Sequence, residues 1–127
     1  MLVAYSESLP PLPAWLEDER AKMDPVPECM TPTFLFAEGQ PDGSLVFHFD
    51  IPPQSPTVRG LAAILANGLN GNQPDEILSV PADFYLKMKL QEVITHQRLN
   101  GFLGILAHMK KAAASAFFSA GPEVETG

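Results

Sequence analysis

A β-hairpin is predicted by residues 33–50, which read TFLFAEGQPDGSLVFHFD. The first part, 33–37, is short and rich in aromatic residues, as strands are. Residues 38–44 are the expected connection, because Asp42-Gly43 is a pair that tight turns favour. Side chains alternate between the two sides of the returning strand, 45–50. One side carries Leu45, Phe47 and Phe49, and the other carries Val46, His48 and Asp50.

Helices are predicted on both sides of this hairpin. Before it, residues 13–22 begin with a proline, carry acidic residues early and end with a lysine, which suits a short helix. After it, a proline cluster ends the strand and a helical period begins, with Ser55 or Thr57 as its cap. The apolar residues that set this period are Val58, Leu61, Ala62, Leu65 and Leu69.

The rest of the chain is predicted to be mainly helical. Helical turns are expected at 73–78 and 84–89, and residues 117–127 are expected to form a loose tail. A single apolar stripe marks the last helix and consists of Leu99, Phe102, Leu103, Leu106, Met109 and Ala113. The order of a helix, a hairpin and several helices predicts an α+β fold. Its helices pack on one face of a small antiparallel sheet.

Composition narrows the class of protein. The 127 residues fit a single domain, 1–127, with a core that needs no disulfide or metal. The net charge of −7 argues against a nucleic acid or an anionic membrane as partner. No apolar run reaches the ~20 residues of a membrane span, and residues 1–10 do not resemble a signal peptide. One cysteine excludes an internal disulfide and fits a reducing compartment, so a cytoplasmic protein is expected.

Cys29 is the residue that offers the clearest chemistry. The three histidines lack the spacing of a metal site, and no glycine-rich nucleotide motif or nucleophile elbow is present. Pro27 and Pro32 keep the cysteine out of a helix or a central strand. A thiol on such a loop can react with a partner, or it can be a small buried apolar residue. The neighbouring Glu28 disfavours a thiolate, whereas a cation brought close by the fold would favour one.

Several short motifs follow one another along residues 9–116. They are Leu-Pro-Pro-Leu-Pro (9–13), Val-Pro-Glu-Cys (26–29) followed by Phe34, Val-Arg-Gly-Leu (58–61), Pro-Asp-Glu-Ile (74–77) and Thr-His-Gln-Arg-Leu-Asn-Gly (95–101). Taken in this order, they resemble the SufE family of sulfur-acceptor proteins in iron–sulfur cluster assembly. In that family the segment around the cysteine reads Val-Pro-Gly-Cys, and a tryptophan stands at the position of Phe34.

This resemblance implies a SufE/NifU-like fold and a role for Cys29. The cysteine would take sulfur from the persulfide of a SufS-like cysteine desulfurase, stimulate that enzyme, and pass the sulfur to a SufBCD-like scaffold. Arg98, at the start of the last helix, would stabilise the thiolate together with the helix N-terminus. Supporting roles fall to His96, Met30 and Phe34. Met30, Phe34 and Phe36 are expected to shelter the persulfide.

No metal or organic cofactor is implied, and the protein would be a sulfur-transfer accessory rather than a stand-alone enzyme. The altered residues around Cys29 leave a second interpretation, in which a non-catalytic module on the same fold binds and regulates a desulfurase or scaffold. A cysteine hydrolase is a third interpretation, although the sequence carries no local signature of one.

Overall fold

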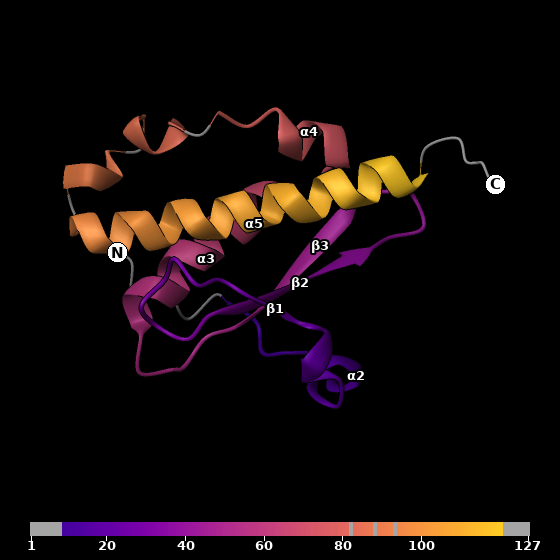
Figure 1. Cartoon of the computed structure of the whole chain (residues 1–127), viewed down its shortest axis with the longest axis horizontal. Coiled ribbons are helices and arrows are strands. Elements are labelled where there is room, and N and C mark those ends of the chain that lie inside the picture. The colour runs from indigo at the N-terminus through magenta and orange to yellow at the C-terminus, as the bar shows by residue number, and fades with distance from the viewer. Residues whose placement is uncertain (1–8, 82, 88, 93, 121–127) are drawn as a thin grey trace.

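A computed structural model describes residues 9–81, 83–87, 89–92 and 94–120. Short 3-10 turns cover Arg20–Lys22, Phe84–Leu86 and Leu90–Glu92. In Figure 1 the longest helix, α5, lies along the long axis of the molecule, between the sheet and the segment that contains α4. The helices and strands, in chain order, are α2 (Ala14–Glu17), β1 (Asp24–Pro25), β2 (Phe34–Gly39), β3 (Leu45–Asp50), α3 (Pro56–Leu69), α4 (Pro74–Leu78) and α5 (His96–Ala120).

The sheet is antiparallel, in the order β1-β2-β3. The predicted hairpin is confirmed: β2 pairs with β3 through a tight connection in which Gly43 has a φ of 91°. Leu35 lies opposite Phe49 and Ala37 lies opposite Phe47. The predicted faces of β3 are also confirmed, because Leu45, Phe47 and Phe49 are buried whereas the alternate residues are partly exposed.

Helices cover both faces of the sheet. On the inner face, α3 and α5 pack against β2 and β3 and against each other, and their apolar stripes form most of the core. On the outer face, the ring of Trp15 makes edge-to-face contacts with Phe36 and His48, which face each other across β2 and β3. Figure 1 shows α2 on the side of the sheet away from α5. The sequence analysis placed the helices on one face of the sheet and therefore missed this short helix on the other face.

Two predicted helices are wrong in their extent. Residues 13–22 form four residues of α-helix and then a separate 3-10 turn. Leu16 is the buried side chain of this segment, so little packing supports a longer helix. Of the predicted helix 84–89, Phe84–Leu86 form a 3-10 turn, and Lys89 has a φ of 58°. A left-handed residue cannot continue a right-handed helix, so a second 3-10 turn begins beyond it.

Helix ends also differ in part from expectation. Ser55 occupies the N-cap position of α3 but makes no capping side-chain bond, and its hydroxyl donates to Thr31 Oγ1 at 3.4 Å. Thr57, the other predicted cap, is the second residue of the helix itself. For α5, Thr95 Oγ1 accepts the backbone N–H of Arg98 at 3.2 Å, a typical capping bond. The predicted loose tail of 117–127 is wrong for 117–120, which are helical. Residues 121–127 lie outside the described part of the chain.

Candidate functional site

Cys29 lies on the loop that joins β1 to β2, residues 26–33, called the Cys29 loop below. The Val26 N–H donates to the Thr33 carbonyl at 2.9 Å and closes the loop at its base. The Cys29 N–H donates to the Val26 carbonyl at 3.2 Å, which makes a turn around Pro27. The cysteine is half-buried and packs against the core. The prediction of a proline-flanked loop is therefore confirmed, and β1 is an addition to it.

The Cys29 loop lies directly on α5 at two glycines. A methyl group on Gly101 would come within 3.2 Å of Cys29 Sγ and 3.5 Å of its Cα. A methyl group on Gly104 would come within 2.6 Å of Glu28 Cβ, closer than real side chains approach. Glycines at these two positions, three residues apart on one side of the helix, let the backbone of the loop settle against it. Gly101 and Gly104 therefore form the surface of α5 on which the Cys29 loop lies, called its seat below.

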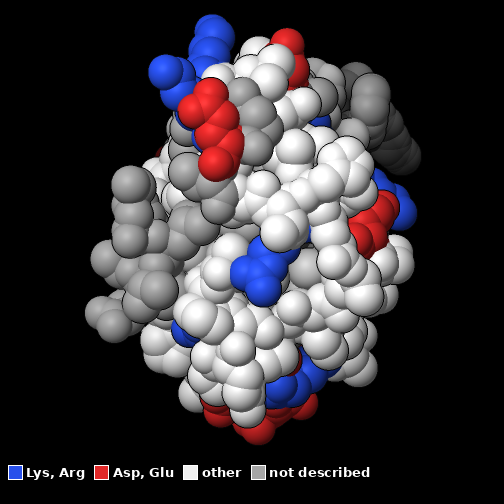
Figure 2. All heavy atoms as spheres, turned by 90° about the vertical axis from the view of Figure 1, so that its left-hand side faces the viewer, with Lys and Arg blue, Asp and Glu red and all other residues white. Residues whose placement is uncertain are grey.

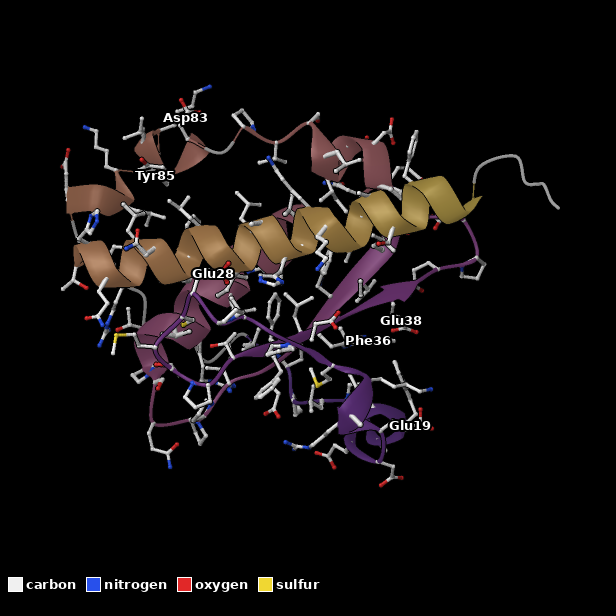
Figure 3. The ribbon with its side chains drawn as sticks, viewed as in Figure 1. Glu19, Glu28, Phe36, Glu38, Asp83 and Tyr85 are labelled. Carbon is white, nitrogen blue, oxygen red and sulfur yellow. The ribbon has the colours of Figure 1, made fainter. Side chains whose placement is uncertain are left out.

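Polar contacts hold the same loop in place. Glu28 Oε1 lies 3.1 Å from Nε2 of His108, one helical turn beyond Gly104. Figure 3 shows Glu28 on the part of the Cys29 loop that lies beside α5. On the other side, Thr31 accepts the hydroxyl of Ser55 from the start of α3. The loop is thus attached to both long helices of the core.

A pocket of about 240 Å³ opens beside the Cys29 side chain. Its apolar wall comes from α3 and α5, while Met30, 78% exposed, stands at its edge. Phe34 and Phe36 are not among the residues that line it, so the expected shelter from these two aromatic residues is wrong. The ring of Phe36 contacts Trp15 on the outer face of the sheet. The pocket is lined by Cys29, Met30, Thr31, Val58, Leu61, Gln97, Arg98, Gly101, Phe102 and Ile105.

The structure places Arg98 at the pocket that Cys29 lines but does not place His96 there. Arg98 lines the pocket, because it lies on the same side of α5 as Gly101 and Ile105, three and seven residues later. His96 is the first residue of α5, is exposed and does not line the pocket. Cys29 Sγ lies beside Gly101, which is ~7 Å along the helix axis from His96 at 1.5 Å per residue. The helix dipole acts most strongly within the first turn of a helix, and the sulfur lies beyond that turn. The expected help from the helix N-terminus is therefore weak.

Three contributors to the site were not predicted from the sequence. His108 and Gly104 were unassigned, although the spacing of Gly101, Gly104 and His108 along one helix face was a signal that a close neighbour lies there. Thr33 was counted only as a strand residue. It is 2% exposed, and its hydroxyl lies 3.4 Å from Cys29 Sγ. A buried hydroxyl beside the only thiol is visible only in three dimensions.

Within the described residues, no group of three or more His, Cys, Asp or Glu side chains is placed to hold a metal ion. No helix in the same part of the chain is long and apolar enough to cross a membrane. The described site therefore consists of one thiol, a cation, a buried hydroxyl and an apolar wall.

These features define a class of small α+β domain that presents one loop cysteine in a pocket between two helices. The chain belongs to the SufE family, since the family model described as "SufE: Fe-S metabolism associated domain" matches residues 1–113. The resemblance of the sequence motifs to this family is thereby confirmed.

Individual relatives agree with this assignment. An uncharacterized SufE-like protein of Mycobacterium tuberculosis is 38% identical over 116 residues, which are 91% of this chain and 80% of that protein. A protein named cysteine desulfuration protein SufE, from Plasmodium vivax, is 37% identical over 57 residues, 45% of this chain and 24% of that protein. The solution structure of a hypothetical protein from Thermus thermophilus has a TM-score of 0.80 and 32% identity, and the match covers 93% of this chain and 82% of that one.

Proposed function

We propose that this protein accepts sulfur from a cysteine desulfurase on Cys29 and hands it to a scaffold on which iron–sulfur clusters are assembled. The observation that carries the proposal is the position of Cys29, half-buried at a pocket that Arg98 also lines. Family membership supports a role in iron–sulfur metabolism, and the name of the Plasmodium relative supports a desulfurase as sulfur donor.

The proposed reaction moves one sulfur atom without net oxidation. Cys29 first loses its proton to solvent. Its thiolate then attacks the outer sulfur of the desulfurase persulfide, R–S–SH, and forms the bond of a new persulfide, Cys29–S–SH. The sulfur–sulfur bond of the donor breaks, and the desulfurase cysteine leaves as a thiolate, R–S⁻. The charge of the attacking thiolate ends on the leaving thiolate, so the charges balance.

Two features of the pocket suit this chemistry. The guanidinium of Arg98 carries a positive charge, which favours an anionic sulfur nearby. Val58, Phe102 and Ile105 supply an apolar wall that would separate the outer sulfur of the product from other thiols. Figure 2 shows the end of the molecule that carries the start of α5 as a largely uncharged surface with a basic side chain near its middle. A surface of this kind suits close contact with another protein.

The direct test is intact-mass analysis after incubation with a cysteine desulfurase, its cofactor and free cysteine. The full chain should gain the mass of one sulfur atom, and dithiothreitol should remove it. Because the sequence has a single cysteine, the adduct can form a persulfide only at Cys29. Cys29→Ser should show no adduct and an unchanged circular dichroism spectrum. A desulfurase that turns over while the wild-type chain gains no sulfur would overturn the proposal.

Arg98 provides a second test. Arg98→Ala should slow sulfur transfer severalfold, because the pocket loses its cation. Arg20→Ala is the matched control. Arg20 forms an ion pair with Asp50, at 2.5 Å, and neither residue lines the pocket. Rapid-quench mass measurement of both variants gives the rates. Equal slowing in the two variants would show that overall charge, rather than the local cation, is responsible.

The same experiments distinguish the alternative of a non-catalytic regulatory module. A module of that kind would stimulate the desulfurase through binding alone, so Cys29→Ser would leave the stimulation unchanged. Under the sulfur-acceptor function, Cys29→Ser removes the stimulation while leaving the partner surface intact.

A further inference from the structure

Thr33 is the last residue of the Cys29 loop, directly before β2. It is 2% exposed, it carries a hydroxyl, and that hydroxyl lies 3.4 Å from Cys29 Sγ. Its backbone carbonyl accepts the Val26 N–H at 2.9 Å, at the base of the Cys29 loop. The hydrogen bond that closes the loop therefore holds the backbone of the residue that carries this hydroxyl.

The Thr33 hydroxyl has two neighbours but only one hydrogen. Its oxygen lies 3.0 Å from the Thr31 carbonyl and 3.4 Å from Cys29 Sγ. The carbonyl can only accept a hydrogen bond, whereas the sulfur can donate as a thiol and can only accept as a thiolate. The protonation state of Cys29 thus decides where the hydrogen of Thr33 points.

We propose that the Thr33 hydroxyl is a switching hydrogen-bond donor for the reacting sulfur. In the thiol state, the Cys29 S–H donates to Thr33 Oγ1, and the Thr33 O–H donates to the Thr31 carbonyl. When the thiol loses its proton to solvent, the Thr33 O–H turns to the thiolate. Thr31 is half-buried, so its carbonyl can then accept a hydrogen bond from water.

The Thr33 hydroxyl serves both steps of the proposed sulfur transfer, and this role rests on the proposed function. It stabilises the Cys29 thiolate that attacks the donor persulfide. It also stabilises the same thiolate when Cys29 is the leaving group in transfer to the scaffold. Between the two steps the inner sulfur carries no charge, and the hydroxyl can return to the Thr31 carbonyl. The hydroxyl thus assists both the uptake of sulfur by Cys29 and its transfer to the scaffold, and it does not stabilise the persulfide between the two steps.

The test uses iodoacetamide, which reacts with the thiolate and needs no desulfurase. Thr33→Val removes the hydroxyl and keeps a similar shape, while Thr33→Ser keeps the hydroxyl. At fixed pH the full chain carrying Thr33→Val should be alkylated about tenfold more slowly than wild type, because it loses a hydrogen bond to a charged group. Thr33→Ser should stay within about twofold of wild type, since its hydroxyl can still donate. Equal rates in all three proteins would overturn the proposal.

A replacement variant and an NMR measurement complete the test of the Thr33–Cys29 contact. If Thr33→Val does not fold, Thr33→Ala takes its place. In wild type, the ¹³Cβ resonance of Thr33 should shift in step with Cys29 alkylation as the pH is raised. A resonance that does not move overturns the inference whatever the variants do. Absence of a sulfur adduct on the wild-type chain would contradict the proposed function alone, because alkylation reports only on the Thr33–Cys29 contact.

Discussion

Two loops flank β2, and they are held in different ways. The hairpin loop, residues 40–44, is stabilised mostly from within, because Asp42 Oδ1 accepts hydrogen bonds from the backbone N–H of Ser44, at 2.9 Å, and from its hydroxyl, at 2.6 Å. One distant residue, Gln73, adds a hydrogen bond from its Nε2 to the Asp42 carbonyl at 3.0 Å. The Cys29 loop depends more on distant residues. The side chain of Glu28 contacts His108, 80 positions away, and the hydroxyl of Thr31 accepts a hydrogen bond from Ser55. Gly101 and Gly104 add the surface on which it lies.

The difference shows how the loop that carries the cysteine can be held in place and still be able to move. A locally bonded turn keeps its shape as long as its own few residues are intact. A loop held by tertiary contacts can leave its seat when those contacts break, while the rest of the fold remains. The Cys29 loop belongs to the second kind, which suits a thiol that, under the proposed function, meets two other proteins.

The largest effect is expected when the seat itself is filled. Gly104→Ala places a methyl group 2.6 Å from Glu28 Cβ, so the Cys29 loop has to shift. The free energy of unfolding should fall by about 2 kcal/mol from this overpacking, even after the helix gains from alanine. Alkylation of Cys29 should become faster because the loop leaves α5. Urea denaturation and iodoacetamide kinetics measure the two effects.

Gly68→Ala is the control for this substitution. Gly68 is an exposed residue of α3 with no neighbouring atom within 4 Å of the added methyl group. Alanine should therefore stabilise the protein by about 0.5–1 kcal/mol through helix propensity alone. If Gly104→Ala stabilised the chain as Gly68→Ala does, the Cys29 loop would not lie on α5 as described.

The hairpin loop should respond locally to a comparable change. Gly43 has a φ of 91°, a conformation that alanine rarely adopts, so Gly43→Ala should cost about 1 kcal/mol in the free energy of unfolding. The alkylation rate of Cys29 in the folded protein should not change, since the added methyl group meets the end of the Gln73 side chain, at 3.0 Å, and not the Cys29 loop. A change in that rate similar to the one in Gly104→Ala would show that the two loops are coupled.

The same contrast explains how much the sequence could reveal. The hairpin, its Asp42-Gly43 turn and the buried face of β3 follow a two-residue period and local turn chemistry, so each could be read from neighbouring residues. α3 and the apolar stripe of α5 were also predictable, because their apolar residues recur at the helical period. β1 was missed because two residues that include a proline carry no period.

The candidate site could be predicted only in part. Cys29 was the single thiol, and the prolines around it indicated a loop. Arg98 was named by family resemblance, and helical geometry then accounts for its place on the same face of α5 as Gly101. Thr33 and the pairing of Glu28 with His108 were beyond prediction, because contacts between distant residues follow from packing rather than from local pattern.

A smaller effect is expected from the polar attachment of the Cys29 loop. Glu28→Ala or His108→Ala should each lower the free energy of unfolding by less than about 1 kcal/mol, because both side chains are partly exposed. A double-mutant cycle should give a coupling of about 0.5 kcal/mol. Each variant should also speed alkylation of Cys29 modestly, since the seat on α5 is retained. Additive effects without coupling would contradict a stabilising contact between the two residues.

The smallest effect concerns the hairpin loop and appears only in acid. The hydrogen bonds from Ser44, first from its hydroxyl and then from its backbone N–H, hold the pKa of Asp42 below its ordinary value of 3.8. A carboxyl group with a lowered pKa stabilises the fold fully above its ordinary value, and this contribution is lost as the pH falls through the lowered pKa. Asp42→Asn removes this titration, so its unfolding free energy should decline less steeply than that of wild type below pH 3.8, while the alkylation of Cys29 at neutral pH stays the same. Urea denaturation at a series of acidic pH values gives both curves, and parallel curves would show that the bonds to Ser44 do not favour the ionised form of Asp42.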